Sequence, residues 1–263
     1  MLECKNLTYR AGSATILDGV SLVARDGEIT VVVGNNGSGK TTLIRSFSTY
    51  HEHKPHVFGE MLVDSLAVPT LSPRELARRI SLLPQSLGRP AITTEELVML
   101  GRASLRSPFS HTTEEDRRAV ALAIEELGLS SLAIRPLPNL SGGELQSAYF
   151  AMLLAKNAKN LMLDEPTSSL DSVRRALVFS FLRGMRERGS AVLLVLHDLT
   201  DAVRIADKIA VMDKGRIIFD GTPSELEHSG IPERIFGLSA AKAEMEGALT
   251  TVYLPVGRDY SQK

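Results

Sequence analysis

The chain has 263 residues, of which 43% are hydrophobic, so it can bury a full core as one large domain or two small ones. Its 30 basic and 31 acidic residues nearly cancel, which excludes a general attraction to nucleic acid or anionic lipid, and we expect no nucleic-acid partner. The longest apolar runs, such as residues 191–196, are far shorter than a membrane span. Cys4 is the only cysteine, and Met1 leads into a polar segment rather than a signal sequence. We therefore expect a cytosolic protein without an internal disulfide.

The first part of the chain, to about residue 85, alternates short strand-like runs with turns. The runs KNLTY, GEITVVVG, GEMLVD and ARRISLLPQ predict strands, and a helix is expected from Pro73 to Arg79. The middle, from about residue 86 to residue 160, is predicted to be mostly helical. Its segment TTEELVMLGR has a capping-box pattern, and TTEEDRRAVALAIEELGL has apolar residues at helical spacing before a glycine.

Strands return after residue 160 in the runs NLMLDEP, SAVLLVLHD and ADKIAVMDKGRIIFDG. Helical segments separate the first of these strands from one another. The order strand, helix, strand implies a parallel sheet. The last stretch, AKAEMEGALTTVYLPVGRDYSQK, predicts a helix and a strand. The sequence therefore predicts an α/β core that a helical insertion interrupts.

The first run that carries chemistry is VVVGNNGSGKTT, in which three valines precede a glycine-rich turn and the start of a helix. Gly34, Gly39, Lys40 and Thr41 match the pattern G-x-x-x-x-G-K-[ST] of a phosphate-binding loop. Backbone N–H groups of the turn would point at the β-phosphate, Lys40 would reach the β- and γ-phosphates, and the Thr41 hydroxyl would ligate Mg²⁺. A glycine-rich turn with a solvated lysine is the alternative, and the loop alone leaves kinases, GTPases and motors open.

A second feature is the apolar run LML that ends in Asp164 and Glu165. At the carboxyl end of a strand, Asp164 could hold Mg²⁺ through water while Glu165 orients and deprotonates the attacking water. Two acids at a strand end are also often only solvated turn residues, and taken alone the pair leaves both interpretations open. Together with that loop they predict nucleotide hydrolysis.

The third feature is the run LSGGE, from Leu140 to Glu144, which precedes a helix-like stretch about twenty residues before the acidic strand. It resembles the LSGGQ signature of ABC-type ATPases, and the neighbouring motifs agree along almost the whole chain. Tyr9 matches the aromatic residue that stacks on adenine in that family, and Gln85 matches the glutamine that follows Mg²⁺ and the γ-phosphate. The segment ending in Asp171 looks like the D-loop, and His197 looks like the histidine that senses the γ-phosphate.

Each of these residues also has an ordinary structural explanation. Tyr9 alone would pack at a strand edge, Gln85 would be a loop amide, and Asp171 would cap the helix that follows it. A lone His197 after a buried strand would likewise be a packing residue. It is the order of the motifs along the chain that favours the functional interpretation.

The resemblance implies a P-loop NTPase core with a mostly parallel sheet and an N-terminal antiparallel β part, in residues 1–85 and 161–263. Residues 86–160 would form the inserted helical subdomain that carries the signature. ATP and Mg²⁺ would be the cofactors. The implied catalytic residues are Glu165, His197, Gln85 and Lys40. The implied nucleotide-binding residues are Tyr9, Gly34, Asn35, Asn36, Gly37, Ser38, Gly39, Lys40, Thr41, Thr42, Ser141, Gly142, Gly143 and Asp171. The implied metal ligands are Thr41, Gln85 and Asp164.

The signature also implies a homodimer. Ser141 and the two following glycines would begin a helix whose free N–H groups bind the γ-phosphate, but in this fold they lie far from Lys40 of the same chain. In the family, two copies meet head to tail with two ATP molecules between them, and hydrolysis lets the pair reopen. Three departures from the family pattern bear on how tightly the dimer closes: Glu144 replaces a glutamine, Ser147 an arginine and Asn35 a frequent proline.

The remainder of the chain narrows the expected role. The segments ITTEELVMLGR, ARRISLLPQS and HDLTDAVRIADKIAVMDKGRIIFDGTPSEL closely resemble importer ATPases for iron-siderophore, haem and cobalamin. This resemblance implies a peripheral subunit at the cytoplasmic face of the membrane, under two transmembrane permease subunits and indirectly served by a substrate-binding protein. An ATPase for another cargo, such as metal ions or amino acids, and a soluble ABC-type ATPase outside transport are the alternatives. The chain has one set of motifs and no heptad run, which disfavours the soluble class.

One cluster lies outside these motifs, the run YHEHKPH with His51, His53 and His56. The H-x-H spacing with a further histidine could bind a metal, but it fits no defined ligand pattern. We expect a solvated loop between a helix and a strand.

Overall fold

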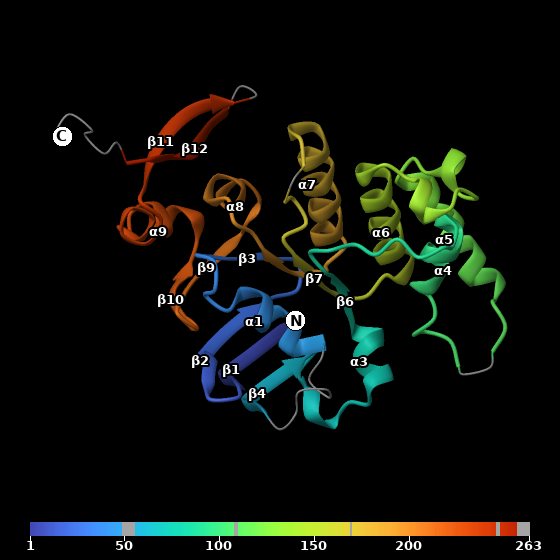
Figure 1. Ribbon diagram of the computed structural model, residues 1–263, viewed down its shortest axis with the longest axis horizontal. Coiled ribbons are helices and arrows are strands. Elements are labelled where there is room, and N and C mark those ends of the chain that lie inside the picture. Colours follow the sequence, from blue (N-terminus) through green and yellow to red (C-terminus); the bar gives the residue numbers. More distant parts are fainter. Residues whose placement is uncertain (49–55, 108–109, 169, 246–247, 257–263) are drawn as a thin grey trace.

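The computed structural model describes residues 1–48, 56–107, 110–168, 170–245 and 248–256, and these form three sheets surrounded by helices (Figure 1). One sheet has four strands in the order β2-β1-β4-β5, a second has six in the order β10-β9-β3-β8-β7-β6, and the third pairs β11 with β12. The strands are β1 (Leu2–Ala11), β2 (Ala14–Ala24), β3 (Ile29–Gly34), β4 (Val57–Val63), β5 (Leu66–Ala67), β6 (Ile80–Leu83), β7 (Asn160–Asp164), β8 (Ala191–Val195), β9 (Lys208–Asp213), β10 (Arg216–Gly221), β11 (Leu238–Met245) and β12 (Ala248–Pro255).

The six-stranded sheet is the centre of the molecule, and its strands are parallel except β10, which runs antiparallel to β9 at one edge. Every residue of β3 is buried, as a strand covered on both faces requires. Its side chains alternate between two cores, because Val32 packs in one hydrophobic cluster whereas Val31 and Val33 pack in the other. The expected parallel sheet is confirmed.

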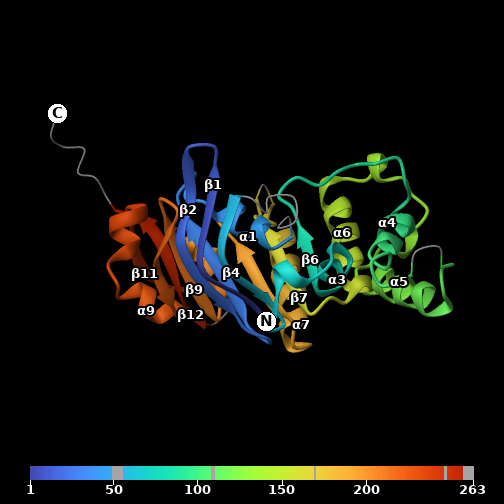
Figure 2. The ribbon, with the colours of Figure 1, turned by 90° about the horizontal axis from the view of Figure 1, so that it is seen from below.

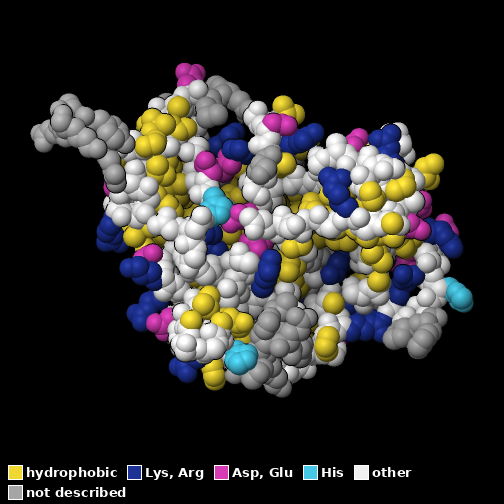
Figure 3. All heavy atoms as spheres, viewed as in Figure 1, with side chains coloured by type: hydrophobic (Ala, Val, Ile, Leu, Met, Phe, Trp, Pro, Cys, Tyr) yellow, Lys and Arg dark blue, Asp and Glu magenta, His cyan; other side chains and the backbone are white. Residues whose placement is uncertain are grey.

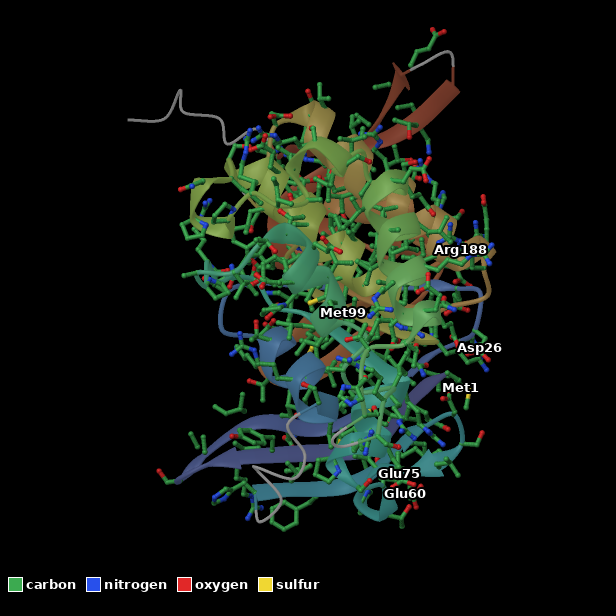
Figure 4. The ribbon with its side chains drawn as sticks, turned by 90° about the vertical axis from the view of Figure 1, so that its right-hand side faces the viewer. Met1, Asp26, Glu60, Glu75, Met99 and Arg188 are labelled. Atoms are coloured by element: carbon green, nitrogen blue, oxygen red, sulfur yellow. The ribbon has the colours of Figure 1, made fainter. Side chains whose placement is uncertain are left out.

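The antiparallel sheet lies beside the central sheet, and helix α1 (Lys40–Ser48) packs between them. In the side view of Figure 4 the antiparallel strands form a separate layer below the helices. Leu43 and Phe47 of α1 are buried in the cluster that both sheets share. The sequence analysis predicted no strand at residues 14–24, where the structure has β2. Asp18 and Gly19 in the middle of this strand resemble a turn, and tertiary pairing with β1 overrides that signal.

The region between residues 86 and 160 contributes helices that bury their own cluster of leucine, valine, isoleucine and alanine side chains. Figures 1 and 2 both show α4, α5 and α6 together at one end of the molecule. The subdomain boundaries at residues 85 and 161 stay a prediction. The longer helices are α3 (Pro73–Arg79), α4 (Thr94–Leu100), α5 (Glu114–Glu126), α6 (Gly142–Lys156), α7 (Ser172–Glu187), α8 (Leu199–Ile205) and α9 (Pro223–Glu227). The short turns of helix are η2 (Val68–Thr70), η3 (Ser130–Leu132), η4 (Leu137–Asn139) and η5 (Pro232–Phe236).

Local sequence signals define several helix starts. The predicted helix from Pro73 to Arg79 is confirmed as α3, and the capping box of Thr93 and Glu96 is present at the start of α4. In that box the Thr93 hydroxyl accepts from the Glu96 N–H while the Glu96 carboxylate accepts from the Thr93 N–H. Within the part of the chain that the structure describes, no helix is long and apolar enough to cross a membrane.

The C-terminal stretch differs from its prediction, because β11 and β12 form an antiparallel hairpin where a helix and a strand were expected. The helix-forming residues of AKAEM are overridden by pairing with β12 over the full length of both strands. Tyr253 of β12 is buried, and its backbone N–H donates to the Thr200 hydroxyl of α8 at 3.0 Å. The hairpin is therefore anchored to the core through α8.

Candidate functional site

The candidate residues gather at the carboxyl ends of four neighbouring strands, β3, β8, β7 and β6. The glycine-rich turn follows β3, His197 follows β8, and Glu165 follows β7. Gln85 comes two residues after β6. Because parallel strands end at the same edge of a sheet, ligands of α/β proteins bind there. The backbone alone therefore brings together four motifs that lie up to about 160 residues apart in sequence.

Glycines shape the turn between β3 and α1. A Cβ atom on Gly34 would come within 2.2 Å of the Met212 carbonyl oxygen, so only glycine fits against β9. Gly39 has a φ of +103°, in the region that favours glycine, and its Cβ would meet the side chain of Leu17 at 2.9 Å. The turn therefore takes a path that glycine allows at these two positions, and within it the Ser38 N–H donates to the Asn35 carbonyl at 3.1 Å.

Lys40 is buried at the first position of α1, and its Nζ donates to the carbonyl oxygens of Gly34 at 2.8 Å and Asn35 at 3.1 Å. Burial lowers the pKa of Lys40, while the charges of Glu165 and Asp164 oppose that shift. A buried ammonium held only by loop carbonyls is poorly neutralised. An anion bound in the loop would neutralise the buried charge of Lys40.

Asp164 ends β7 with its side chain fully buried. Its Oδ1 accepts from the Thr41 hydroxyl at 3.1 Å, whereas its Oδ2 has no hydrogen-bond partner and lies 3.9 Å from Nη2 of Arg45. Burial raises the pKa of Asp164, and the Thr41 hydrogen bond and the Arg45 charge reduce the rise. A buried carboxylate with one unpartnered oxygen beside a threonine hydroxyl is a donor set of the type that Mg²⁺ takes.

Glu165 is held by two side chains from neighbouring strands. Its Oε2 accepts from Nε2 of Gln85 at 2.6 Å, and its Oε1 lies 2.5 Å from Nε2 of His197. Glu165 is buried and has a φ of +51°, an uncommon conformation for a residue with a side chain. Its backbone is fixed there by a hydrogen bond from its N–H to the Val195 carbonyl at 3.1 Å. Strained backbone of this kind is enriched at functional sites.

The remaining residues of the predicted nucleotide site lie in the glycine-rich turn after β3 and in the antiparallel sheet. Asn35, Asn36 and Gly37 are exposed, whereas Ser38 is buried. Tyr9 of β1 is opposite Leu17 and Val57 in the antiparallel sheet and packs partly buried against the core. The Asn35 side-chain amide, at a position where proline is frequent in the family, donates to the Ile235 carbonyl at 3.1 Å. No residue pattern around Asn35 indicates this contact.

The signature residues form the start of α6, as predicted. Ser141 is the N-cap, its hydroxyl accepts from the Glu144 N–H at 3.3 Å, and the Glu144 carboxylate accepts from the Ser141 N–H at 2.7 Å. Glu144 is therefore the second member of a capping box, a role for which glutamate and glutamine both serve. The departure from the family glutamine keeps this geometry and adds a charge.

One hydrogen bond and one hollow join the signature helix to the segment after β7. The buried side chain of Gln146 donates to the Pro166 carbonyl. Gln85, Glu165 and Gly142 line a single hollow of about 270 Å³, together with side chains from the neighbouring loops. The Gln146 contact was missed at the sequence level, because only the folded chain brings α6 beside this loop.

Asp171 lies after the segment that resembles a D-loop, of which position 169 is outside the described residues. It is the N-cap of α7, and its carboxylate accepts from the Arg174 N–H at 2.9 Å. The capping interpretation of Asp171 is confirmed, and it leaves a role in nucleotide binding open. Of the histidine cluster, His51 and His53 are outside the described residues, and His56 is exposed. Among the residues that are described, no group of three or more His, Cys, Asp or Glu could hold a metal ion.

Fold and site together define a P-loop protein that binds nucleoside triphosphates. The sequence profile of the ABC transporter family matches residues 17–168, from β2 to the segment after the acidic pair. The chain belongs to this ABC transporter family.

Individual relatives cover almost the whole chain. It is 34% identical over 259 residues to the ferric enterobactin transport ATP-binding protein FepC of Escherichia coli (strain K12), covering 98% of this chain and 94% of that protein. It is 35% identical over 256 residues to the hemin import ATP-binding protein HmuV of Bradyrhizobium diazoefficiens, with 94% and 92% covered. Among solved structures, an inward-facing metal-chelate type ABC transporter matches with a TM-score of 0.83 and 25% identity over 98% of both chains.

Proposed function

We propose that this chain is the ATP-hydrolysing subunit of an ABC importer for an iron chelate, haem or a cobalamin-type substrate. The observation that carries the proposal is the convergence of Lys40, Asp164 and Glu165 at the carboxyl edge of the central sheet. Binding of ATP would close a head-to-tail dimer, and hydrolysis would reopen it. The motion would drive uptake through partner membrane subunits.

The nucleotide would lie in the turn from Gly34 to Thr42. Lys40 already donates to two loop carbonyls and would exchange them for phosphate oxygens, whose negative charge offsets the desolvation of the buried ammonium. Tyr9 would stack on the adenine ring. Asn35 and Asn36 would lie beside the phosphates, and the N–H groups of the glycines would face them.

Thr41, Asp164 and Gln85 would hold Mg²⁺. The fit rests on the unpartnered Oδ2 of Asp164 and on the Thr41 hydroxyl that already contacts the same carboxylate. Oxygen ligands of this kind suit a hard divalent cation that keeps several waters and phosphate oxygens in its shell. The ion would neutralise the charge that develops on the phosphates.

Glu165 would act as the general base and His197 would hold the γ-phosphate. The 2.5 Å approach of His197 to Glu165 places both groups at one point of the sheet edge, and Gln85 contacts the other carboxylate oxygen. Binding of the nucleotide would draw Gln85 toward the metal and His197 toward the phosphate. Glu165 would then be free to accept a proton from the attacking water.

The signature turn would complete the site of a second copy. The Ser141 hydroxyl accepts from the Glu144 N–H in the cap and also hydrogen-bonds the Glu144 carboxylate, and it would turn its proton from that carboxylate to a γ-phosphate. The N–H groups of Gly142 and Gly143 stand at the first turn of α6, where a helix favours an anion. Asp171 would contribute at the same interface. The homodimer therefore holds two ATP molecules, each between Lys40 of one chain and Ser141 of the other.

The remaining partners follow from the relatives. FepC and HmuV are named as transport and import ATP-binding proteins for ferric enterobactin and hemin. We infer for this chain two permease subunits, an associated substrate-binding protein and a peripheral position at the cytoplasmic face of the membrane. The helical part between residues 86 and 160 would receive the permease.

The proposal is tested in two steps with the full chain. Purified protein is first assayed for phosphate release from ATP with Mg²⁺ and with EDTA, and we expect release only with the metal. An absence of Mg²⁺-dependent release would refute the ATPase function. The chain is then expressed with its membrane partners and solubilised from membranes, where a permease should co-purify. Recovery only from the soluble fraction would instead support a soluble ABC ATPase.

A further inference from the structure

Arg174 lies across the signature turn of its own chain. A Cβ atom on Gly143 would come 2.4 Å from Nε and 2.7 Å from Cζ of Arg174, so the guanidinium rests directly on the glycine. The same Nε lies 3.6 Å from Oδ2 of Asp171, the residue that caps α7. Arg174 therefore contacts both segments that would face a second copy, the signature turn and the D-loop.

The position of Arg174 joins two hollows in the surface. It lines the hollow of about 270 Å³ that contains Glu165 and Gln85, and also a hollow of about 370 Å³ between α6 and α7. Ser147, which stands where the family commonly has an arginine, lines the second hollow. The guanidinium beside the signature thus comes from α7 in this chain.

The signature turn carries a negative charge that the family glutamine would not supply. Hydrogen bonds from Ser141 are the main cause that lowers the pKa of Glu144, and the charges of Arg135 and Arg174 lower it further. Nη1 of Arg135 lies 3.8 Å from Oε1 of Glu144. Glu144 is therefore ionised at neutral pH, at the helix end that would meet a triphosphate.

We propose that Arg174 is a positioning residue for the ATP-bound dimer: it holds the signature turn against the D-loop and, with Arg135, offsets the charge of Glu144. This inference rests on the proposed ATP-dependent dimer. A carboxylate at this helix terminus repels phosphate, and two nearby guanidinium groups restore the positive potential. Arg174 is about half exposed, so its effect is modest and is screened by salt.

The test measures dimer formation in a chain that does not turn over. In a Glu165→Gln background, the ATP concentration for half-maximal dimerisation is determined by sedimentation velocity, with and without Arg174→Gln. An exposed ion pair has a small effect and the dimer contains two such turns, so we expect Arg174→Gln to raise this concentration on the order of tenfold. The affinity of the monomer for ADP, which uses its own phosphate loop, should stay unchanged.

The charge argument is tested by adding Glu144→Gln. In that background the loss caused by Arg174→Gln should shrink to about threefold, because the contact with the D-loop remains but no carboxylate is left to offset. The difference between the two backgrounds should also narrow as KCl rises to about 1 M, where charges a few ångströms apart at the surface are screened. A purely structural role of Arg174 would give the same loss in both backgrounds and at every salt concentration, and this result would overturn the inference.

Arg188→Gln is the matched control, because Arg188 lies near the C-terminal end of the same helix and lines the same larger hollow. Its guanidinium pairs with Glu126 at 2.7 Å, and Figure 4 places it at the edge of the molecule. Arg188→Gln should leave dimerisation unchanged. If Glu165→Gln alone fails to dimerise with ATP, the proposed function fails; if it dimerises and Arg174→Gln has no effect, only the present inference fails.

Discussion

The sheet edge and the signature turn, which are the two halves of the proposed site, are built in opposite ways. At the edge, Lys40, Asp164 and Glu165 are buried, and their charged groups form hydrogen bonds with neighbouring side chains and loop carbonyls. At the turn, Ser141 and Gly142 are exposed, and the hydrogen bonds of the cap keep the helix end in shape. Figure 3 shows basic, acidic and hydrophobic side chains interspersed on the face that it presents. The buried half is held by contacts within the fold, whereas the exposed half has the accessibility that the proposed dimer needs.

This contrast predicts that substitutions in the buried half change chemistry or nucleotide binding, while those in the turn change dimer assembly. The largest expected effect is that of Glu165→Gln. Loss of the general base should lower the rate of phosphate release by about 1,000-fold and leave ATP binding intact, measured by single-turnover assay and equilibrium binding. Glu187→Gln, at the exposed end of α7, is the control. A normal rate for Glu165→Gln would show that another group accepts the proton.

Next in size is Lys40→Ala, which removes the buried ammonium from the phosphate loop. Hydrogen bonds to charged groups contribute about 1.5–3 kcal/mol each, so affinity for ATP should fall by about 10-fold to 100-fold. Isothermal titration with ATP measures the change. Lys159→Ala removes an exposed lysine that pairs with Asp26, and it should bind ATP normally. Equal affinities for wild type and Lys40→Ala would place the triphosphate elsewhere.

Ser141→Ala tests the exposed signature turn, and its expected effect is smaller than that of Lys40→Ala. It should weaken ATP-dependent dimerisation about tenfold while the monomer binds ADP with unchanged affinity, since the serine would serve the other chain's nucleotide. It also removes an N-cap and should destabilise the protein by about 1 kcal/mol. Thr113→Ala is the matched control, because Thr113 caps α5 in the same type of box away from the turn. An equal loss of dimerisation in Thr113→Ala would assign the effect to stability.

The smallest expected effect is the change in thermal stability caused by Asp164→Asn in the absence of a bound metal ion. Burial raises the pKa of Asp164 above its ordinary value of 3.8. Between the two pKa values the folded state therefore holds a proton that the unfolded state releases, and the free energy of unfolding falls as the pH rises through this interval. Asp164→Asn removes this penalty and should raise the Tm at pH 7 in EDTA by about 2 °C. The gain should shrink as the pH falls toward 3.8. A lower Tm for the variant at pH 7 would show that the carboxylate stabilises the fold.

Local signals predicted much of the fold, and long-range contacts explain the exceptions. The capping box of Thr93 and the boundaries of α3 could be predicted because their hydrogen bonds join residues three or four apart. The strand β2 was missed, and the hairpin of β11 and β12 was wrongly predicted in part, because pairing partners decided both. Hydrophobic runs followed by motif residues predicted which side chains would meet at the sheet edge.

The contacts that refine the candidate site have no local signal. Gln146 reaches Pro166, Asn35 reaches Ile235, and Arg174 rests on Gly143, in each case across 20 or more residues of sequence. Each depends on the relative placement of two helices or loops. Such placement follows from packing of the whole chain, so no residue pattern around either partner indicates it.

The place of β3 between β8 and β9 has a consequence for biosynthesis. The phosphate-loop strand leaves the ribosome early, but both of its neighbours come from residues 191–212, and the Asn35 contact needs Ile235. Until those late segments emerge, this mostly apolar strand lacks the hydrogen-bond partners that it has in the folded protein. Nucleotide binding is therefore one of the last properties that a nascent chain acquires. Until then the unpaired edges of β3 need protection from aggregation while translation continues.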